Sequence, residues 1–311
     1  MSNFWEKLPK LFLVLAPMED VTDVVFREIV YSLARPDVFF TEFTNAEGLT
    51  SKGQKAVIHR LKYTKNQRPI VAQIWGTKPD SMFRAAELVR KLGFDGVDIN
   101  MGCTDKAVVK KGAGAGLIDN FDLVKEIISA VKKGASGLPV SVKTRLGSNE
   151  WASFLLGQSL SALTIHARSV GMLMKGAADW NEIAKIVKIK DQINPQTLII
   201  GNGDIKNYKQ ALEMHKTHKV DGIMIGRGIF LNPWVFEKTL TPAIHTKKQS
   251  LQALSKHVAE FKKTWGDTKN FNSLKKFLKM YINNFDGADA FRQKLMNSRS
   301  METLQGNLED F

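Results

Sequence analysis

Eight short apolar runs, rich in Val and Ile, alternate with longer segments of helical periodicity over the first 240 residues of this 311-residue chain. We expect strands at 11–16, 38–43, 70–75, 96–101, 140–145, 162–168, 198–203 and 222–227. Most gaps hold a predicted amphipathic helix, as at 79–92, 121–133 and 206–217. Strands that are almost continuously apolar are buried on both faces, as parallel strands are. The alternation predicts an α/β fold and favours a (β/α)8 TIM barrel over a doubly wound sheet, which usually has about five to seven strands.

The pattern changes after residue 240, where the strand-like runs stop. A linker-like segment, TPAIHTKKQS, leads into three predicted helices at 249–264, 271–285 and 287–298. We therefore predict a barrel domain over 1–240 and a small C-terminal all-helical domain over 241–311. The second segment has 12 Lys and Arg against 7 Asp and Glu, which gives it a net charge of +5.

The whole chain has a net charge of +14, from 45 Lys and Arg against 31 Asp and Glu. Such an excess attracts polyanions, nucleic acid first, although a basic surface can also serve solubility alone. The single cysteine excludes a disulfide framework and a cysteine-rich zinc site, and the histidines do not cluster with carboxylates, so we predict no metal. No apolar run approaches the roughly 20 residues of a membrane-spanning helix, and the first residues resemble a strand, not a signal peptide. We expect a cytoplasmic protein without membrane association.

Polar side chains recur at the carboxyl ends of the predicted strands, where TIM barrels hold their active sites. They are Glu42, Gln73, Asp98, Asn100, Lys143, Arg145, His166 and Arg168, and the first, seventh and eighth strands end in APMED, GNGD and GRG. An unpaired buried polar group costs about 1–3 kcal/mol, so fold stability alone does not explain this pattern. It predicts a functional site at the mouth of the barrel.

The glycines that follow the last two predicted strands indicate a phosphate site. Gly201, Gly203, Gly226 and Gly228 would let backbone N–H groups approach an anion closely. Arg227 would add a bidentate donor. The alternative is a pair of ordinary glycine-rich turns.

One cationic and two amide side chains at the mouth indicate a cofactor but leave alternatives open. Lys143 could form a Schiff base, as in barrel aldolases, or could face an electron-rich cofactor ring as a fixed cation. Gln73 and Asn100 offer paired donor and acceptor edges that suit a planar heterocycle.

The only cysteine, Cys103, also has two interpretations. A lone cysteine is usually a small buried apolar residue, but this one lies in a loop just past the fourth predicted strand. Three lysines follow it, and they could lower its pKa or hold a polyanionic substrate. These lysines are Lys106, Lys110 and Lys111.

Ordered strings along nearly the whole chain resemble the tRNA-dihydrouridine synthase family. The strings are APMEDVTDVVFR (16–27), TEF (41–43), AQIWG (72–76), DINMGC (98–103), KKGAGAGLI (110–118), PVSVKTRLG (139–147), LTIHAR (163–168), IIGNGDI (199–205), DGIMIGRGIFLNPWVF (221–236) and LKKFLKMYINNFDGADAFRQKLMNSRS (274–300). The resemblance implies an FMN-dependent reductase that consumes NADPH and converts specific tRNA uridines to 5,6-dihydrouridine. FMN N5 would deliver hydride to uracil C6.

The resemblance also implies roles for individual residues. Cys103 would be the catalytic acid that protonates uracil C5. The implied cofactor-binding residues are Pro17, Met18, Gln73, Lys143, His166, Asn202, Gly203, Asp204, Gly226 and Arg227. The implied substrate contacts are Asn100, Arg145, Lys106, Lys110 and Lys111.

The chain departs from the family pattern at two places. Thr104 follows the cysteine where the family usually has proline, which would stiffen the loop. The segment between Gly147 and Leu163 is several residues shorter than usual, so we expect an abbreviated helix near 151–158.

Two other functions compete with the tRNA reductase, namely a flavin barrel acting on a small metabolite, such as a dihydroorotate-type dehydrogenase, and a non-catalytic RNA-binding protein. We expect a monomer. The sequence does not identify the modified uridine or separate NADPH from NADH.

Overall fold

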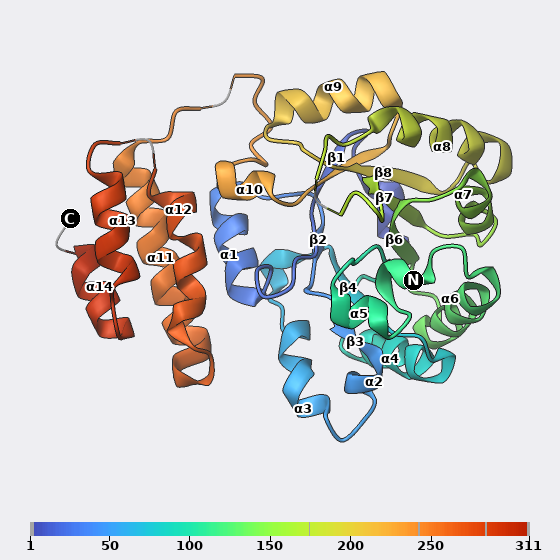
Figure 1. Cartoon of the computed structure of the whole chain (residues 1–311), viewed down its shortest axis with the longest axis horizontal. Coiled ribbons are helices and arrows are strands. Elements are labelled where there is room, and N and C mark those ends of the chain that lie inside the picture. The colour runs from blue at the N-terminus through green and yellow to red at the C-terminus, as the bar shows by residue number, and fades with distance from the viewer. Residues whose placement is uncertain (1–2, 174, 242, 284, 310–311) are drawn as a thin grey trace.

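The structure, a computed structural model, describes residues 3–173, 175–241, 243–283 and 285–309, and shows a parallel barrel with helices packed beside it (Figure 1). The strands are β1 (Phe12–Leu15), β2 (Phe39–Phe40), β3 (Thr44–Asn45), β4 (Ile70–Trp75), β5 (Gly96–Met101), β6 (Val140–Leu146), β7 (Ala162–Ser169), β8 (Leu198–Asn202) and β9 (Gly222–Ile225). Their order is β1-β9-β8-β7-β6-β5-β4-β2, with β3 also on β4. A parallel bridge between Val14 and Val38 brings β1 beside β2, so the sheet returns on itself. The predicted (β/α)8 architecture is confirmed.

The second predicted strand, 38–43, is wrong in its extent. It is divided into β2, which pairs with Ile70 and Val71, and β3, which pairs with Ile74 and Trp75. Between them the hydroxyl of Thr41 accepts the backbone N–H of Gln73 at 3.1 Å. A side chain therefore replaces a backbone carbonyl at this point, and the regular ladder is interrupted.

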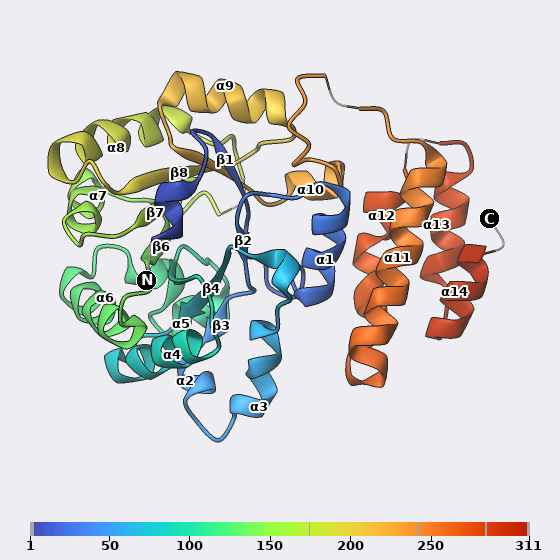
Figure 2. The ribbon, with the colours of Figure 1, turned by 180° about the vertical axis from the view of Figure 1, so that it is seen from behind.

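Helices cover the outside of the barrel (Figures 1 and 2). They are α1 (Val24–Leu33), α2 (Ala46–Leu49), α3 (Gln54–Val57), α4 (Pro79–Lys91), α5 (Lys106–Lys110), α6 (Phe121–Ala135), α7 (Asn149–Leu156), α8 (Trp180–Ile193), α9 (Tyr208–His218) and α10 (Gly228–Leu231). Single 3-10 turns occur at Phe4–Lys7, Ile58–Leu61, Lys65–Gln67 and Gly114–Leu117. The helices expected at 79–92, 121–133 and 206–217 are confirmed as α4, α6 and α9.

The helix between β6 and β7 is short, as the shortened segment predicts. The side chain of Ser148 accepts the Trp151 N–H at 3.1 Å and caps the first turn of α7. Trp151 is fully buried and stacks with Phe154 at a ring separation of 6.1 Å. These contacts anchor the abbreviated helix, and β6 and β7 remain paired with one irregularity after Arg145.

The barrel interior has an apolar base and a polar upper part. The base is one buried cluster that includes Trp5, Phe12, Val14, Phe40, Val71, Ala162, Ile200 and Met224. Alternation along parallel strands sends every second side chain inward. Nearer the carboxyl ends the buried inward positions become polar, as at Gln73, Asp98 and Ser141. The polar functional region is therefore built on a packed apolar base.

The described chain after residue 246 contains helices joined by short turns, and no strand. It contains α11 (Lys247–Trp265), 3-10 turns at Gly266–Thr268 and Phe271–Phe277, α12 (Leu278–Tyr281), α13 (Ala288–Met296) and α14 (Met301–Glu309). We call residues 247–309 the tail. Within the described ranges, no helix combines the length and the apolar character that a bilayer span requires.

Two of the three predicted tail helices are confirmed as α11 and α13, and α14 was not predicted. The helix expected at 271–285 is instead a 3-10 segment followed by a single α-turn, with residue 284 outside the described part. In 3-10 geometry side chains three apart align, which places both Leu274 and Phe277 on the buried face.

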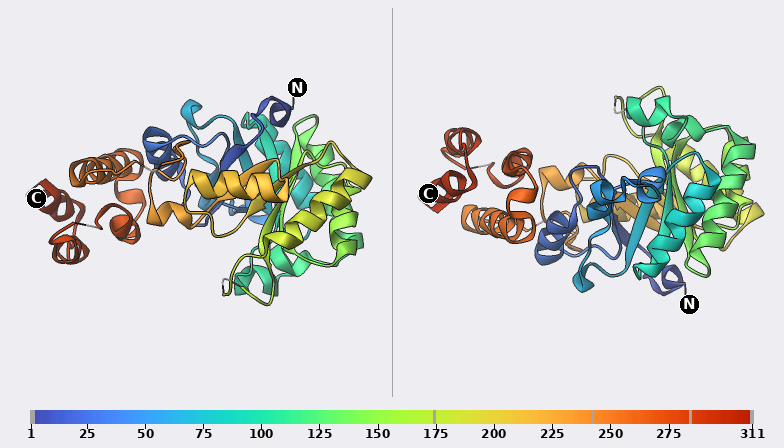
Figure 3. Two further views of the ribbon diagram at one scale, coloured as in Figure 1. Left: turned by 90° about the horizontal axis from the view of Figure 1, so that it is seen from above. Right: turned by 90° about the horizontal axis from the view of Figure 1, so that it is seen from below.

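The tail packs against one side of the barrel, next to α1 and α10 (Figure 3). The Phe277 ring stacks on Phe26 of α1 at 5.0 Å and on Phe230 of α10 at 6.2 Å between ring centroids. Buried residues on both sides belong to one apolar cluster. The domain boundary at residue 240 stays a prediction, because the packing is continuous across it.

A buried aspartate forms the polar centre of this interface. Asp23 Oδ1 caps α1 by accepting the Phe26 N–H at 2.9 Å. Its Oδ2 accepts from the Trp265 indole at 3.1 Å and from Lys269 Nζ at 2.7 Å, both from the tail. Burial raises the pKa of Asp23, but Lys269 and the hydrogen bonds outweigh it and hold the pKa below its ordinary value. The ionised carboxylate therefore fixes the tail to the segment that follows β1.

Candidate active site

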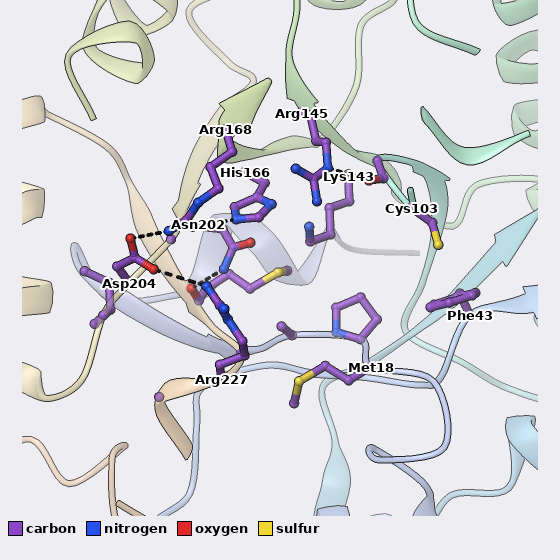
Figure 4. Close-up of a pocket in the computed structure, with 18 of the residues that line it drawn as sticks. Met18, Phe43, Cys103, Lys143, Arg145, His166, Arg168, Asn202, Asp204 and Arg227 are labelled. Carbon is purple, nitrogen blue, oxygen red and sulfur yellow. Dashed lines mark hydrogen bonds and ion pairs between the residues drawn. The ribbon is translucent and has the colours of Figure 1, made fainter. Parts of the chain in front are cut away.

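A cavity of about 640 Å³ opens at the carboxyl ends of the barrel strands (Figure 4). The predicted residues that line it are Pro17, Met18, Gln73, Asn100, Cys103, Lys143, Arg145, His166, Asn202, Gly203, Asp204, Gly226 and Arg227. They are distant in the sequence, and they meet because parallel strands present their carboxyl ends on one face of a barrel. The volume lies within the range of about 300–1,000 Å³ that small-molecule and cofactor sites occupy.

The three predicted lysines after the cysteine lie outside the lining of this cavity. Lys106 and Lys110 are exposed on α5. Lys111 is also exposed, with its Nζ 5.5 Å from the centre of the Trp75 ring. They form a basic surface next to the Cys103 loop, and their contact with a polyanion stays a prediction.

Several hydrogen bonds hold the loop that carries Cys103. Asn100 Oδ1 accepts the backbone N–H groups of Gly102 and Cys103, at 3.1 and 2.9 Å. The Cys103 carbonyl accepts the Ala115 N–H at 2.8 Å. The loop is thus fixed by its neighbours, with Thr104 in the position where proline was expected.

The Cys103 thiol holds its proton more strongly than an ordinary cysteine. Burial raises its pKa, the Asp105 and Glu19 carboxylates act in the same direction, and the Asp105 N–H on Sγ and the Lys143 cation partly oppose them. Lys106, Lys110 and Lys111 are not among the groups that lower this pKa, and the net shift is upward. In Figure 4 the thiol lies on the wall of the cavity near Phe43. A thiol that stays protonated at neutral pH is suited to donate a proton.

Lys143 lies in the central part of the cavity on β6 (Figure 4). Burial and the Arg145 guanidinium lower its pKa to about 8, while Asp98 and Cys103 act in the opposite direction. At neutral pH the side chain is therefore mainly a half-buried cation.

Arg145, two residues further along β6, is engaged by backbone carbonyls. Its Nε donates to Gly102 O at 2.9 Å, and its Nη1 donates to Leu173 O at 2.6 Å and to Ser169 O at 3.2 Å. The side chain links the Cys103 loop to the loop after β7. Its predicted contact with a substrate base stays a prediction.

His166 is a neutral imidazole in this cavity. Burial, together with nearby cations that include Lys143 and Arg145, lowers its pKa to about 2. Arg168 Nη1 lies 3.2 Å from His166 Nε2. Because a guanidinium can only donate, Nε2 accepts and Nδ1 carries the proton.

An ion-pair bridge forms the other end of the cavity (Figure 4). Asp204 accepts from Arg168 Nη2 at 2.5 Å and from Arg227 Nη2 at 3.3 Å. The Ala178 N–H also donates to it, at 3.0 Å. Arg168 is buried, whereas the Arg227 side chain is 53% exposed. Asp204 therefore orients Arg227, which keeps donors available toward the cavity.

The four glycines near this end of the cavity lack a side chain for different structural reasons. A side chain on Gly201 would lie 2.2 Å from the Trp180 ring, and one on Gly228 would lie 2.1 Å from a backbone carbonyl in the loop after β8. Packing therefore explains these two. Gly203, with φ +144°, Gly226 and Gly228 line the cavity, so these three can bring backbone close to a ligand, whereas Gly201 does not line it.

Some residues that line the cavity, and one residue beneath it, were not predicted to have a role. The apolar walls include Phe43, Met224, Phe230 and Leu231. Phe43 is the last residue of the second predicted strand, and its position at a strand end was a usable signal. Arg168 lies two residues after His166 on β7, so strand periodicity puts both on one face. Asp98, fully buried below the cavity, was noted only as a polar residue near a strand end.

Comparison with known proteins gives one family. The model of the family described as Dihydrouridine synthase (Dus) matches residues 14–311. A Staphylococcus aureus (strain COL) protein named "Probable tRNA-dihydrouridine synthase" is 45% identical over 318 residues, covering 100% of this chain and 96% of that protein. A Bacillus subtilis (strain 168) protein named "Probable tRNA-dihydrouridine synthase 2" is 44% identical over 320 residues, with 100% and 97% coverage.

Among solved structures, a variant of NCR from Zymomonas mobilis has a TM-score of 0.51 and 17% identity, covering 78% of this chain and 95% of that chain. At this level of identity the similarity concerns the fold alone, and it agrees with the barrel.

Proposed function

The chain belongs to the dihydrouridine synthase family, and on this premise we propose that it reduces specific uridines of tRNA to 5,6-dihydrouridine, with bound FMN and with NADPH as reductant. The observation that carries the proposal is the composition of one cavity: a cationic end at Arg227, a central Lys143 beside amide groups, and a protonated thiol at Cys103. A flavin phosphate, a flavin ring and a pyrimidine need these three environments in this order.

The donor set of the cavity fits FMN. At one end Arg227 and Lys206 are exposed cations, and Gly203 and Gly226 let backbone approach an anion. We infer that these residues hold the ribityl phosphate, with Asn202 beside them. Asp204 then acts through Arg227, because a carboxylate in direct contact with a phosphate would repel it.

The central part of the cavity fits an isoalloxazine ring. Pro17, Met18 and Met224 supply an apolar surface, and Gln73 supplies a polar amide edge. Lys143 would face the N1/O2 side, where a fixed cation stabilises negative charge. His166, as a neutral Nδ1–H tautomer, adds a donor without adding charge. When bound, FMN supplies the hydride for uracil C6, which it obtains from NADPH.

Cys103 would complete the reduction by donating its proton to uracil C5. Its raised pKa keeps the thiol protonated until a carbanion-like C5 develops. Asn100 and Arg145 hold the flanking loops, and Phe43 offers an aromatic face next to the thiol. The uridine would have to leave its stack to enter the cavity.

The substrate class follows from the relatives' names and from charge. Both curated relatives are named for tRNA. The chain's net charge of +14 suits a polyanionic partner, and the Lys106, Lys110 and Lys111 surface lies beside the proposed entrance. We propose that this surface and the tail contact tRNA phosphates, and that the protein acts as a cytoplasmic monomer.

Mass spectrometry of an unmodified tRNA transcript, incubated with the purified protein, FMN and NADPH, tests the proposal. We expect a gain of 2 mass units at specific uridines, the mass of the two hydrogen atoms added. Cys103→Ala should lower the single-turnover rate by about 10²–10⁴-fold, the usual contribution of a general acid. FMN absorbance of the purified variant should be unchanged, because Cys103 lies at the opposite end from Arg227.

Each competing function predicts a different result. Turnover of a free pyrimidine without activity on tRNA would favour a small-metabolite enzyme. Tight tRNA binding with no FMN uptake and no mass change would favour a non-catalytic RNA-binding protein. An undiminished rate in Cys103→Ala would remove Cys103 from the role of acid.

A further inference from the structure

The residue two positions after the proposed acid has no role in the chemistry described above. Asp105 is exposed and caps the first turn of α5, where its Oδ1 accepts the Ala107 and Val108 N–H groups at 2.8 and 3.3 Å. Its own backbone N–H donates to Cys103 Sγ at 3.4 Å. Asp105 therefore contacts the helix through its side chain and the thiol through its backbone.

The hydrogen bonds of this loop leave a gap at Thr104. The backbone of Cys103 is held on both sides, by Asn100 Oδ1 at its N–H and by the Ala115 N–H at its carbonyl. For Thr104 no hydrogen bond is recorded in the described part of the chain, and it stands where a proline would fix φ at about −65°. The next fixed point along the chain is the helix cap at Asp105.

Close packing also fixes the backbone of Cys103, so its sulfur is the part that can still move. A side chain on Gly114 would lie 2.7 Å from the Cys103 carbonyl oxygen and 3.2 Å from its Cβ. Rotation about the Cα–Cβ bond remains, and it moves Sγ between staggered positions. The Asp105 N–H provides the one hydrogen bond recorded for Sγ among the described residues. This bond therefore favours one position of the thiol.

We propose that Asp105 is a positioning residue for Cys103: by capping α5 it holds the peptide N–H that orients the sulfur, and it thereby supplies the stiffness that a proline at position 104 would give. The thiol that it orients lies on the wall of the cavity (Figure 4). The consequence for protonation of uracil rests on the proposed function, whereas the hold on the sulfur does not.

Asp105 also acts on the thiol through its charge, and two variants separate this effect from the cap. Burial raises the pKa of Cys103, the carboxylates of Asp105 and of Glu19 after β1 add to it, and the Asp105 N–H and the Lys143 cation on β6 oppose it. Arg145, also on β6, is the other charged group that interacts with the thiol. Asp105→Asn removes the charge but keeps an oxygen that caps well, whereas Asp105→Ala removes both.

Thiol labelling of the full-length protein measures both effects, since Cys103 is the only cysteine of the chain. The rate of reaction with a dipyridyl disulfide between about pH 7 and 11 gives the thiol pKa and the rate constant of the thiolate. We expect Asp105→Asn to lower the pKa and to keep the rate constant within about twofold of the wild type. Asp105→Ala should raise the rate constant about fivefold, the factor that corresponds to about 1 kcal/mol of capping. Its pKa should lie above that of Asp105→Asn, because the sulfur is no longer held against its donor.

Two further variants test the link to proline and to the cap. Adding Thr104→Pro to Asp105→Ala should return the rate constant to within about twofold of the wild type, because proline restricts the loop. Asp179→Ala is the matched control. Asp179 caps α8 in the same way, since its Oδ1 accepts the Asn181 and Glu182 N–H groups at 3.1 and 3.4 Å. Its loss should leave the labelling of Cys103 unchanged.

A wild-type rate constant in Asp105→Ala would overturn the proposal, as would an equal increase in Asp179→Ala or the lack of any recovery with Thr104→Pro. Asp105 and Asp179 are both exposed, so we expect each variant to fold. Formation of dihydrouridine is measured in parallel by mass spectrometry. If the wild type forms none, the proposed function fails, while the labelling profile still decides the role of Asp105.

Discussion

Two buried aspartates of this protein have opposite electrostatic surroundings. Asp98 lies beneath the cavity, accepts from the neutral Gln73 and Ser141, and has a pKa raised by burial to about 6. Asp23 lies at the interface between barrel and tail and contacts Lys269 at 2.7 Å. Burial also raises the pKa of Asp23, but the cation and the hydrogen bonds bring it below the ordinary value.

The difference shows that contact with a cation determines whether a buried carboxylate is stable in its ionised form. Paired with Lys269, Asp23 is a stable ion that joins distant parts of the chain. Without such a contact, Asp98 is a costly acceptor whose protonation lies close to the physiological range. An ion pair such as that of Asp23 suits an interface. A carboxylate held by neutral donors, such as Asp98, suits a site where the geometry of the hydrogen bonds matters more than stability.

The largest effect on the free energy of unfolding is expected from replacing Asp23 at the interface. Asp23→Ala removes the α1 cap and leaves the Trp265 indole and Lys269 without their acceptor. We expect a loss of about 2–4 kcal/mol in the free energy of unfolding, less than for a fully buried pair because the Lys269 side chain is 22% exposed. Urea denaturation followed by tryptophan fluorescence measures it.

Two further variants locate the origin of that loss. Asp23→Asn keeps the cap and the indole acceptor but removes the charge, so its loss should be intermediate. Asp20→Asn, at an exposed side chain in the same segment, should change the free energy of unfolding by no more than about 0.5 kcal/mol. A similar loss in Asp20→Asn and Asp23→Ala would contradict the assignment to the buried contacts.

The second prediction concerns opposite pH dependences. The folded-state pKa of Asp98 is raised from 3.8 to about 6, so the unfolded chain releases this proton first and the contribution of Asp98 falls as pH rises from about 4 to 6. We expect Asp98→Asn to gain about 1–3 kcal/mol relative to the wild type across this window. For Asp23 the pKa is lowered, so its contribution is present above 3.8 and is lost as pH falls below that value.

Urea denaturation of the wild type and both Asn variants between pH 3 and 7.5 checks this contrast. The difference between Asp98→Asn and the wild type should grow between pH 4 and 6. The difference between Asp23→Asn and the wild type should shrink only below pH 4. Parallel curves for the two variants would show that the surroundings of the two carboxylates are equivalent.

The smallest effect is expected from removing a neutral donor. Ser141→Ala should cost about 1 kcal/mol, the value of a typical hydrogen bond. Because Ser141 lowers the pKa of Asp98, its loss should also move the pH window upward. Denaturation at pH 5 and 7.5 measures both effects, and a pH window unchanged from that of the wild type would mean that the hydroxyl does not stabilise the ionised carboxylate.

The barrel could be predicted from sequence because its strands are buried on both faces and its longer helices are amphipathic. The prediction was wrong where pairing is set by a single tertiary contact, as at Thr41, whose hydroxyl interrupts the second strand. It also missed α14, whose buried Leu304 and Leu308 give only a short apolar stripe. Short elements of this kind are stabilised by contacts with residues distant in the sequence, which a local sequence pattern does not reveal.

The cavity lining was largely predictable because polar residues at strand ends are unusual in a stable core. The direction of the hydrogen bonds was not predictable. That Gln73 accepts from Asn100 depends on the backbone N–H groups of the Cys103 loop, which donate to the oxygen of Asn100 and leave its NH2 group for Gln73. The same limit applies to Asp23, whose tail partners are more than 240 positions away in the chain.

Pro17 and Met18, which line the cavity, lie only a few residues before the aspartate that fixes the tail. The Lys276 ammonium also donates to the carbonyl of Asp20 in the same segment. The tail is consequently not an independent module that can be exchanged at the linker. A chimaera that takes its tail from another family member would have to take residues 16–23 with it, and would thereby import part of the donor's cavity wall.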